Sequence, residues 1–173
     1  MDPIDERNIL SECTFMRSVG PQLTCAPKYV LHNTFGGGRR YLVMEYLEHS
    51  VEEYLALVPG GEQRDGEMKR LALEMLAAIR QLHELEYIHR DIKTANFRVH
   101  GGKLYLIDFG IKERYSENGS HIQEAKNSLV IGSLKYSSHW THEGINQSRR
   151  DDLEMLGYCL LEMLTGKDLW SEI

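Results

Sequence analysis

The sequence is poor in cysteine, and its cysteines are not arranged for cross-linking. Cys13, Cys25 and Cys159 are the three cysteines among 173 residues, and they are widely spaced without a Cys-x-x-Cys pattern. An odd number of cysteines at this spacing argues against a disulfide framework and against a zinc site, and is typical of a reducing compartment. We therefore expect a cytoplasmic or nuclear protein.

Long hydrophobic stretches are also missing. Residues 1–6 are rich in acidic side chains and contain no apolar segment of the kind that a secretory signal requires. No apolar run approaches the roughly 20 residues with which a helix crosses a bilayer. The sequence therefore predicts no association with a membrane.

An excess of positive charge is absent as well. The sequence has 20 lysines and arginines against 26 aspartates and glutamates, which gives a formal net charge of −6. Binding to nucleic acid through bulk charge needs clustered basic side chains, and the pairs Arg39-Arg40 and Arg149-Arg150 are too short to supply them. We expect no nucleic-acid partner.

The hydrophobic pattern that is present predicts both helices and strands. Apolar residues at helical spacing indicate an amphipathic helix over 66–85 with one buried face. That face consists of Met68, Leu71, Met75, Ala78, Ile79 and Leu82. The other expected elements are helices at 4–19, 50–57 and 151–166, and strands at 28–32, 40–47, 96–100 and 103–107.

Three segments call for separate interpretation. The glycines at 36–38 are expected to form a hairpin turn and not a phosphate-binding loop, because they do not follow Gly-x-Gly-x-x-Gly and no helix comes after them. Residues 109–148 form a long irregular stretch, which in a compact domain is usually functional. The helix at 151–166 is apolar on nearly every side, so we expect it to be covered by more of the same protein or by a partner protein.

Two short motifs carry the chemistry. Residues 89–96 read His-Arg-Asp-Ile-Lys-Thr-Ala-Asn, and residues 108–110 read Asp-Phe-Gly. Each motif is weak alone, but their order and spacing behind an amphipathic helix are specific for phosphoryl transfer. Such a reaction needs a group that orients the attacking hydroxyl, a cation on the phosphoryl group and a positioned metal ion.

The motifs contain one side chain for each of these tasks. Asp91 is predicted to accept or orient the proton of the substrate hydroxyl, and Lys93 to hold the γ-phosphate. Asn96 and Asp108 carry the hard oxygen ligands that Mg²⁺ prefers. A pair of strands separates Asp91 from Asp108 and is expected to fold the two back to one cleft.

In these motifs the chain resembles the protein kinases of the casein kinase I group, which includes the tau-tubulin and vaccinia-related kinases. Residues 133–138, Ser-Leu-Lys-Tyr-Ser-Ser, resemble the Gly-Thr-x-Arg-Tyr-x-Ser segment of that group, and residues 147–154, Gln-Ser-Arg-Arg-Asp-Asp-Leu-Glu, resemble its Gln-Ser-Arg-Arg-Asp-Asp-Leu-Glu. The resemblance runs from about Leu10 to Trp170. It implies an α+β protein-kinase-like fold, with residues 1–45 in the small lobe and residues 46–173 forming the hinge and the first part of the large lobe.

The resemblance also implies ATP and Mg²⁺ as cofactors. Met44 corresponds to the residue at the back of the adenine site, and Glu45 and Leu47 lie in the hinge that binds adenine through its backbone. Arg98 stands where the group usually has a small or apolar residue, so it could stack on the adenine ring or obstruct it. Ser133 and Lys135 would shape the pocket for the protein substrate.

Other residues of the motifs are implied to have supporting roles. Glu12 resembles the glutamate that pairs with the ATP-binding lysine, and Asp152 resembles the buried aspartate that braces the backbone of the catalytic loop. A charge at the start of an apolar helix is costly to bury alone, which favours a bracing role for Asp152. The full supporting set is Glu12, His89, Arg90, Phe109, Gly110 and Asp152.

We therefore predict a serine/threonine protein kinase whose substrate is a hydroxyl group of a protein. The kinase pattern also includes a Gly-rich loop and an ATP-binding lysine before Glu12 and further helices after 166, so the sequence is expected to be truncated at both ends. The alternative that this leaves open is a catalytically inactive kinase fragment that acts as a protein-binding module.

Overall fold

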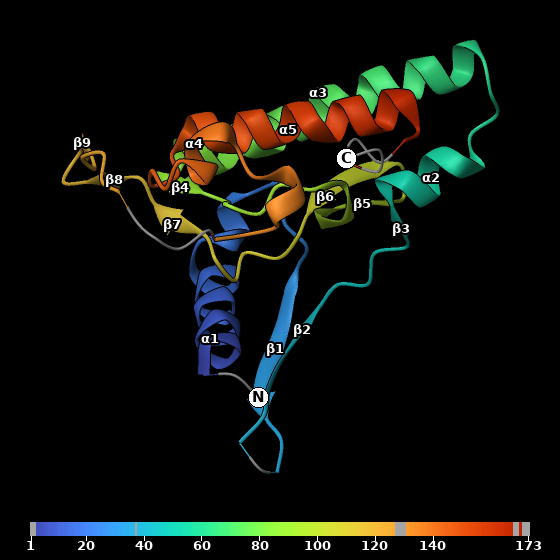
Figure 1. The fold of residues 1–173 in the computed structure, drawn as a ribbon. Coiled ribbons are helices and arrows are strands. Elements are labelled where there is room, and N and C mark those ends of the chain that lie inside the picture. The colour runs from blue at the N-terminus through green and yellow to red at the C-terminus, as the bar shows by residue number, and fades with distance from the viewer. Residues whose placement is uncertain (1–2, 37, 127–130, 168–169, 171–173) are drawn as a thin grey trace.

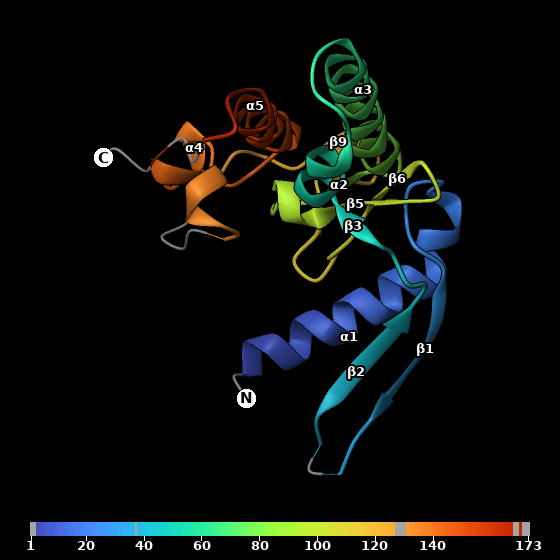
Figure 2. The same cartoon turned by 90° about the vertical axis from the view of Figure 1, so that its right-hand side faces the viewer.

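The structure, a computed structural model, describes residues 3–36, 38–126, 131–167 and 170. Helix α1 (Pro3–Ser18) and the hairpin of β1 (Tyr29–Thr34) and β2 (Arg40–Met44) lie together on one side of a larger, mainly helical part (Figures 1 and 2). The mixture of helix and sheet confirms the predicted α+β class. The predicted division between residues 45 and 46 falls just after β2 and stays a prediction.

The hairpin has the turn that its glycines predict. Strands β1 and β2 pair antiparallel with Thr34 opposite Arg40. The Phe35 N–H donates to the Arg39 carbonyl at 2.7 Å, and Gly38 has a φ of +83°, a backbone angle that suits glycine. Gly37 lies outside the described residues.

The larger part consists of short strands between two long helices. Helices α3 (Glu62–Glu84) and α5 (Arg149–Thr165) run side by side (Figures 1 and 2). Three strands, β3 (His49–Ser50), β5 (Phe97–His100) and β6 (Lys103–Leu106), form a sheet in the order β3-β5-β6. The remaining elements are η1 (Gly20–Gln22), α2 (Val51–Leu57), β4 (Tyr87–Ile88), η2 (Thr94–Asn96), β7 (Glu113–Arg114), β8 (Ser116–Glu117), β9 (Ser120–His121), η3 (Leu134–Tyr136) and α4 (His139–His142).

The core is built around the predicted apolar face of α3. Five of its six residues are buried, and Met68 at its beginning is partly buried. This face packs against the sheet and against the inner face of α5, where Met155 and Cys159 are buried. Burial of this continuous apolar surface is the main favourable contribution to folding.

Helix α5 begins earlier than the hydrophobic pattern indicates. The predicted range was 151–166, whereas the helix starts at Arg149, because the backbone N–H of Ser148 donates to the Asp151 carboxylate at 2.6 Å and fixes the first turn. It ends at Thr165, and Gly166 caps it with a φ of +64°, which suits a glycine at a helix C-terminus.

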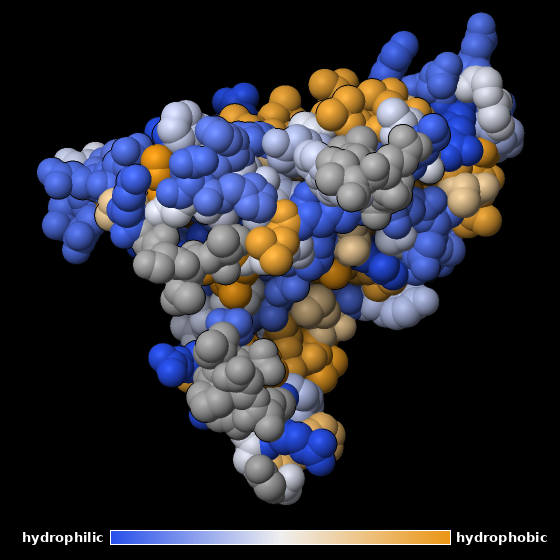
Figure 3. Space-filling view, viewed as in Figure 1, coloured by the Kyte–Doolittle hydropathy of each residue, from blue (hydrophilic) through white to orange (hydrophobic). Residues whose placement is uncertain are grey.

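The outer face of α5 is exposed, and the expectation that more protein covers it stays a prediction. Leu161 is 49% exposed and Leu164 is 68% exposed. Figure 3 shows apolar side chains along the edge of the molecule where α3 and α5 run. Within the described part of the chain, no helix combines the length and the apolar character that a bilayer crossing requires.

The packing of α5 generates a prediction about stability. Met155 is 1% exposed in the core, so Met155→Ala is expected to lower the free energy of unfolding by about 2–5 kcal/mol through lost burial and a cavity. Leu164→Ala on the outer face of the same helix is the matched control, with an expected change within about 0.5 kcal/mol. Urea denaturation measures both, and equal losses would contradict the one-sided packing.

Candidate active site

The carboxylate of Asp91 is the centre of the site. Asp91 follows β4 and is only 7% exposed. Its Oδ1 accepts the backbone N–H of Ser133 at 2.8 Å, and its Oδ2 accepts Lys93 Nζ at 2.6 Å and Asn96 Nδ2 at 3.2 Å. Burial alone would raise the pKa of Asp91, but Lys93 and Ser133 outweigh it and the pKa lies below its usual range. Asp91 is therefore ionised at neutral pH.

Three predicted residues thus surround Asp91 directly. Lys93 Nζ lies between the Asp91 carboxylate and the Ser133 hydroxyl, which it reaches at 3.1 Å. Asn96 donates a second hydrogen bond from Nδ2 to the Asp91 carbonyl at 2.8 Å. Because both bonds use the amide nitrogen, the Asn96 side chain is oriented with its oxygen as the remaining acceptor.

Asp152 holds the backbone that precedes Asp91. It is 1% exposed, and its carboxylate accepts the backbone N–H groups of His89 and Arg90, each at 2.9 Å. A third contact at 2.8 Å joins it to His83 Nε2 on α3. A buried carboxylate needs such a complete set of donors. The geometry is the bracing contact that the resemblance implies, and His83 is a member that the sequence did not reveal.

His89 connects the two motifs through a neutral ring. It is fully buried, and this burial lowers its pKa. Its Nε2 lies 3.1 Å from the Ile107 carbonyl, and its Nδ1 accepts the Asp91 N–H at 3.3 Å. One nitrogen donates and the other accepts, so the ring fits the neutral tautomer. It also packs edge-on against Phe109.

Helix α1 lies against the Asp-Phe-Gly motif. The carboxylate of Glu12 accepts the Phe109 N–H at 3.1 Å, and the Phe109 ring packs 4.9 Å from that of Phe15. A Cβ on Gly110 would lie 3.4 Å from Asn8, which places this part of the motif against α1. Burial, followed by the charge of Asp108, raises the pKa of Glu12, so the two carboxylates face one region.

The oxygen donors near Asp91 fit a magnesium ion that arrives with phosphate groups. Asn96 and Asp108 provide one amide oxygen and one carboxylate, and Mg²⁺ in phosphoryl-transfer sites is commonly held by one or two protein groups together with phosphates and water. Among the described residues, no cluster of three histidine, cysteine, aspartate or glutamate side chains is placed to hold a metal ion. The donor set therefore suits a shared metal better than a metal held by protein alone.

The predicted adenine-binding residues lie at the end of β2 and just after it. The N–H of Glu45 donates to the Lys28 carbonyl at 2.9 Å, and its carboxylate accepts the Lys28 N–H at 3.1 Å, which ties the start of the hinge to β1. Met44 ends β2, and Leu47 is buried. Arg98 Nη2 donates to the Leu47 carbonyl at 3.4 Å.

The two residues that were predicted to shape the substrate pocket make different contacts. Ser133 contacts Asp91 and Lys93 in the site. Lys135 instead pairs with Glu162 of α5 at 2.5 Å, and the hydroxyl of Tyr136 donates to the same carboxylate. Sequence spacing could not show this pairing, because Glu162 lies 27 residues further along the chain.

Gly132 is a further residue that the motifs did not single out. Its φ is +94°, and a Cβ there would come within 2.2 Å of the Arg90 carbonyl oxygen. Only glycine fits such an approach. The sequence could have indicated this glycine, because the segment of the casein kinase I group that residues 133–138 resemble begins with glycine.

Comparison with known proteins agrees with this geometry. Residues 1–173 match the family described as protein kinase domain. The chain is 34% identical over 142 residues to serine/threonine-protein kinase VRK2 of Homo sapiens, which covers 79% of this chain and 28% of the relative. It is 36% identical over 148 residues to a probable casein kinase I homolog of Encephalitozoon cuniculi, which covers 84% of this chain and 46% of the relative.

The chain thus spans less than half the length of either relative. The family match nevertheless extends over all of its residues, which include Lys93 and Asn96 around Asp91. The chain belongs to the protein kinase domain family, and its similarity to these two relatives supports the resemblance to the casein kinase I group.

Proposed function

We propose that this chain transfers the γ-phosphoryl group of ATP to a serine or threonine hydroxyl of a protein. The observation that carries the proposal is the ionised Asp91 carboxylate, held at 2.6 Å from Lys93 and at 2.8 Å from the Ser133 N–H. The fixed carboxylate is oriented before substrate arrives, which is the main requirement of this reaction. The names of both relatives, a serine/threonine-protein kinase and a casein kinase I homolog, support the class of substrate.

Asp91 and Lys93 would have different roles at the reacting atoms. The low pKa of Asp91 makes its carboxylate a weak base, so its first role is to orient the substrate hydroxyl and its second is to take the proton late in the transfer. Lys93 carries a positive charge beside it and would stabilise the negative charge on the moving phosphoryl group. The contact with Ser133 keeps the ammonium group in place.

Asn96 and Asp108 would hold Mg²⁺. When bound, the metal ion neutralises phosphate charge and orients the leaving group. The chain contributes the position of both ligands, because Asn96 is fixed by Asp91 and because the Ile107 N–H, one residue before Asp108, donates to the Asn96 carbonyl at 2.9 Å. Asn96 and the proposed base Asp91 are thus parts of one hydrogen-bonded unit, and Asp108 directly follows a residue bonded to it.

Met44, Glu45 and Leu47 would contact the adenine ring. Arg98 modifies this region, because its guanidinium also donates to the Glu48 carbonyl at 3.2 Å and lies 3.9 Å from Glu53. A guanidinium held on the hinge backbone replaces the flat apolar surface that a base normally packs against. We therefore assign Arg98 as a residue that weakens nucleotide binding.

A second candidate function is a protein-binding module without catalysis. The exposed leucines on the outer face of α5 favour it, since an apolar face of this kind is often covered by a partner. Here the chain would recognise another protein, and Asp91 would serve only to stabilise the loop around it.

Replacing Asp91 tests the catalytic proposal. Asp91→Asn keeps the size of the side chain but removes its charge, so phosphate transfer from Mg-ATP to casein is expected to fall by about 10²–10⁴-fold. Asp65→Asn, at an exposed position of α3, should leave the rate unchanged. Equal rates for wild type and Asp91→Asn would rule out catalysis by this chain.

Replacing Arg98 tests its assignment. Arg98→Leu removes the guanidinium from the Leu47 carbonyl and supplies an apolar surface, so affinity for Mg-ATP should rise about tenfold, or ~1.4 kcal/mol. Isothermal titration calorimetry measures the dissociation constant, with Arg98→Lys as a control that keeps the charge. Weaker binding by Arg98→Leu would show that the guanidinium supports the base instead.

Size-exclusion chromatography separates the two candidate functions. A catalytic domain is expected to elute as a monodisperse monomer with measurable Mg-ATP affinity. A binding module with an uncovered α5 should self-associate, and Leu161→Lys with Leu164→Lys should return it to a monomer. A monomeric chain without nucleotide affinity would contradict both expectations.

A further inference from the structure

The segment from Phe109 to Lys112 lies along one side of α1. At its start the Phe109 N–H donates to the Glu12 carboxylate at 3.1 Å, and the Phe109 ring packs 4.9 Å from the ring of Phe15. At its end the Lys112 ammonium group donates to the carbonyl of Ser11 at 3.2 Å and to the hydroxyl of the same residue. One turn of α1 therefore carries the contacts at both ends of the segment.

The backbone of Asp108 has a conformation that its neighbours must maintain. Its φ of +68° is unusual for a residue other than glycine, and such an angle persists only where surrounding contacts fix it. On one side the Ile107 N–H donates to the Asn96 carbonyl at 2.9 Å, and on the other the Phe109 N–H donates to Glu12. The position of Asp108 thus depends on Glu12, which belongs to a separate helix that itself has to be fixed.

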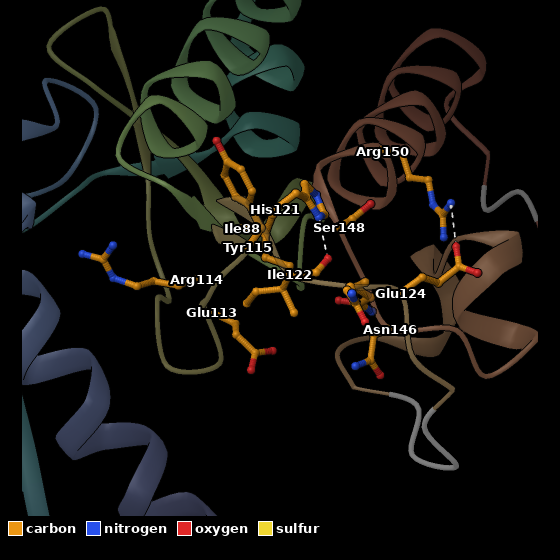
Figure 4. A pocket seen from close by; sticks show the side chains of 12 residues that line it. Ile88, Glu113, Arg114, Tyr115, His121, Ile122, Glu124, Asn146, Ser148 and Arg150 are labelled. Carbon is orange, nitrogen blue, oxygen red and sulfur yellow. Dashed lines mark hydrogen bonds and ion pairs between the residues drawn. The ribbon is translucent and has the colours of Figure 1, made fainter. Parts of the chain in front are cut away.

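The backbone of the segment contributes little to this position. The turn is closed by a hydrogen bond of 3.4 Å from the Lys112 N–H to the Phe109 carbonyl, which is longer than the usual range of about 2.7–3.2 Å. The next residue, Glu113, lines a cavity of about 300 Å³ with Asn146 and Ser148 on another wall (Figure 4). The described residues that line this cavity come from parts of the chain other than α1. Side chains must therefore hold the segment to α1.

The ammonium group of Lys112 is surrounded by groups that favour a cation. It donates to both oxygens of Ser11 and lies 5.4 Å from the centre of the Phe15 ring, within reach of a cation–π contact. Burial lowers the pKa of Lys112, whereas the charge of Glu12 raises it. Burial and the charge of Asp108 raise the pKa of Glu12, and the charge of Lys112 acts in the opposite direction. Lys112 therefore offsets part of the repulsion between these two carboxylates.

We propose that Lys112 is a positioning residue that fixes α1 against the Asp-Phe-Gly motif and thereby sets the position of Asp108. Its ammonium group holds the turn of α1 that carries Glu12, and Glu12 holds the Phe109 N–H beside Asp108. Without this cation the two carboxylates would repel each other more strongly, and α1 would separate from the segment. The effect on rate rests on the proposed function, whereas the anchoring of α1 does not.

Amide hydrogen exchange in the full chain tests the anchoring without any need for activity. Lys112→Met removes the charge but keeps the length of the side chain, so exchange in residues 8–15 and 109–112 should become about tenfold faster. Lys112→Arg keeps the charge, and its exchange should stay within about threefold of the wild type. Lys69→Met, at an exposed position of α3, is the matched control and should leave both segments unchanged.

Two results would overturn the anchoring role. Exchange at the wild-type rate in Lys112→Met would show that the ammonium group is not required. Equal acceleration in Lys112→Met and Lys112→Arg would show that the charge is not what holds α1. If Lys112→Met does not fold, Lys112→Gln, which keeps a hydrogen-bond donor without the charge, provides the same comparison with the same two outcomes.

A double-mutant cycle tests whether Lys112 acts through Glu12. Glu12→Gln already removes one of the two charges, so adding Lys112→Met to it should accelerate exchange of the Phe109 amide by no more than about twofold. A full tenfold acceleration in both backgrounds would show that Lys112 acts independently of Glu12, and this would contradict the proposed route to Asp108.

A rate measurement tests the positioning of Asp108. Lys112→Met should lower kcat with casein about tenfold and raise the Mg²⁺ concentration that gives half the maximal rate, because a misplaced Asp108 affects the metal ion and the reacting atoms. The KM for casein should not change. If the wild-type chain transfers no phosphate, the proposed function fails, and the exchange results still decide on the anchoring of α1. An unchanged kcat beside faster exchange would refute the positioning role.

Discussion

The buried carboxylate of Asp152 is the contact on which the site depends. It lies in the first turn of α5 and accepts the backbone N–H groups of two consecutive residues before Asp91, while His83 joins it from α3. Burying one charge is costly unless donors surround it, and here the donors are the backbone of the catalytic loop itself. The long helices that form the core thereby fix the unusual backbone angle at Arg90 and set the direction of Asp91.

Opposite pKa shifts distinguish two acidic residues of the site, Asp91 and Glu12. Asp91 is buried but receives Lys93 and the Ser133 N–H, so its pKa falls. Glu12 is buried beside Asp108, with Lys112 as a weaker compensating charge, so its pKa rises. The difference follows from the neighbours of each carboxylate and not from burial alone. Glu12 and Asp108 repel each other, and a magnesium ion or another cation between them would relieve this repulsion.

Local patterns predicted most of the elements and the central part of the site. Local signals in the sequence are the helical period of the α3 face, the hairpin and the two motifs. Residues 89–96 are neighbours in the chain, so their closeness in the folded site follows from the sequence alone. The contacts that the sequence did not reveal join residues far apart: Arg90 with Glu113, Lys135 with Glu162, and Gly132 with the Arg90 carbonyl. Each depends on how β7, α5 or the segment before η3 packs, which periodicity does not specify.

The role of Arg98 was left open between stacking on adenine and obstructing it for the same reason, because its contacts with the hinge exist only after β3 and β5 pair.

The two candidate functions draw on opposite faces of one helix. The inner face and first turn of α5 carry Met155 and Asp152, and its outer face carries the exposed Leu161 and Leu164. A partner that covered the outer leucines would stabilise the whole helix, and with it the carboxylate that holds the catalytic loop. The two proposed functions would therefore not be independent, because a partner on the outer face would change the stability of the helix that sets the backbone before Asp91. Any effect of the outer face of α5 on Asp91 would pass through Asp152 and the backbone of the two residues that it holds, His89 and Arg90.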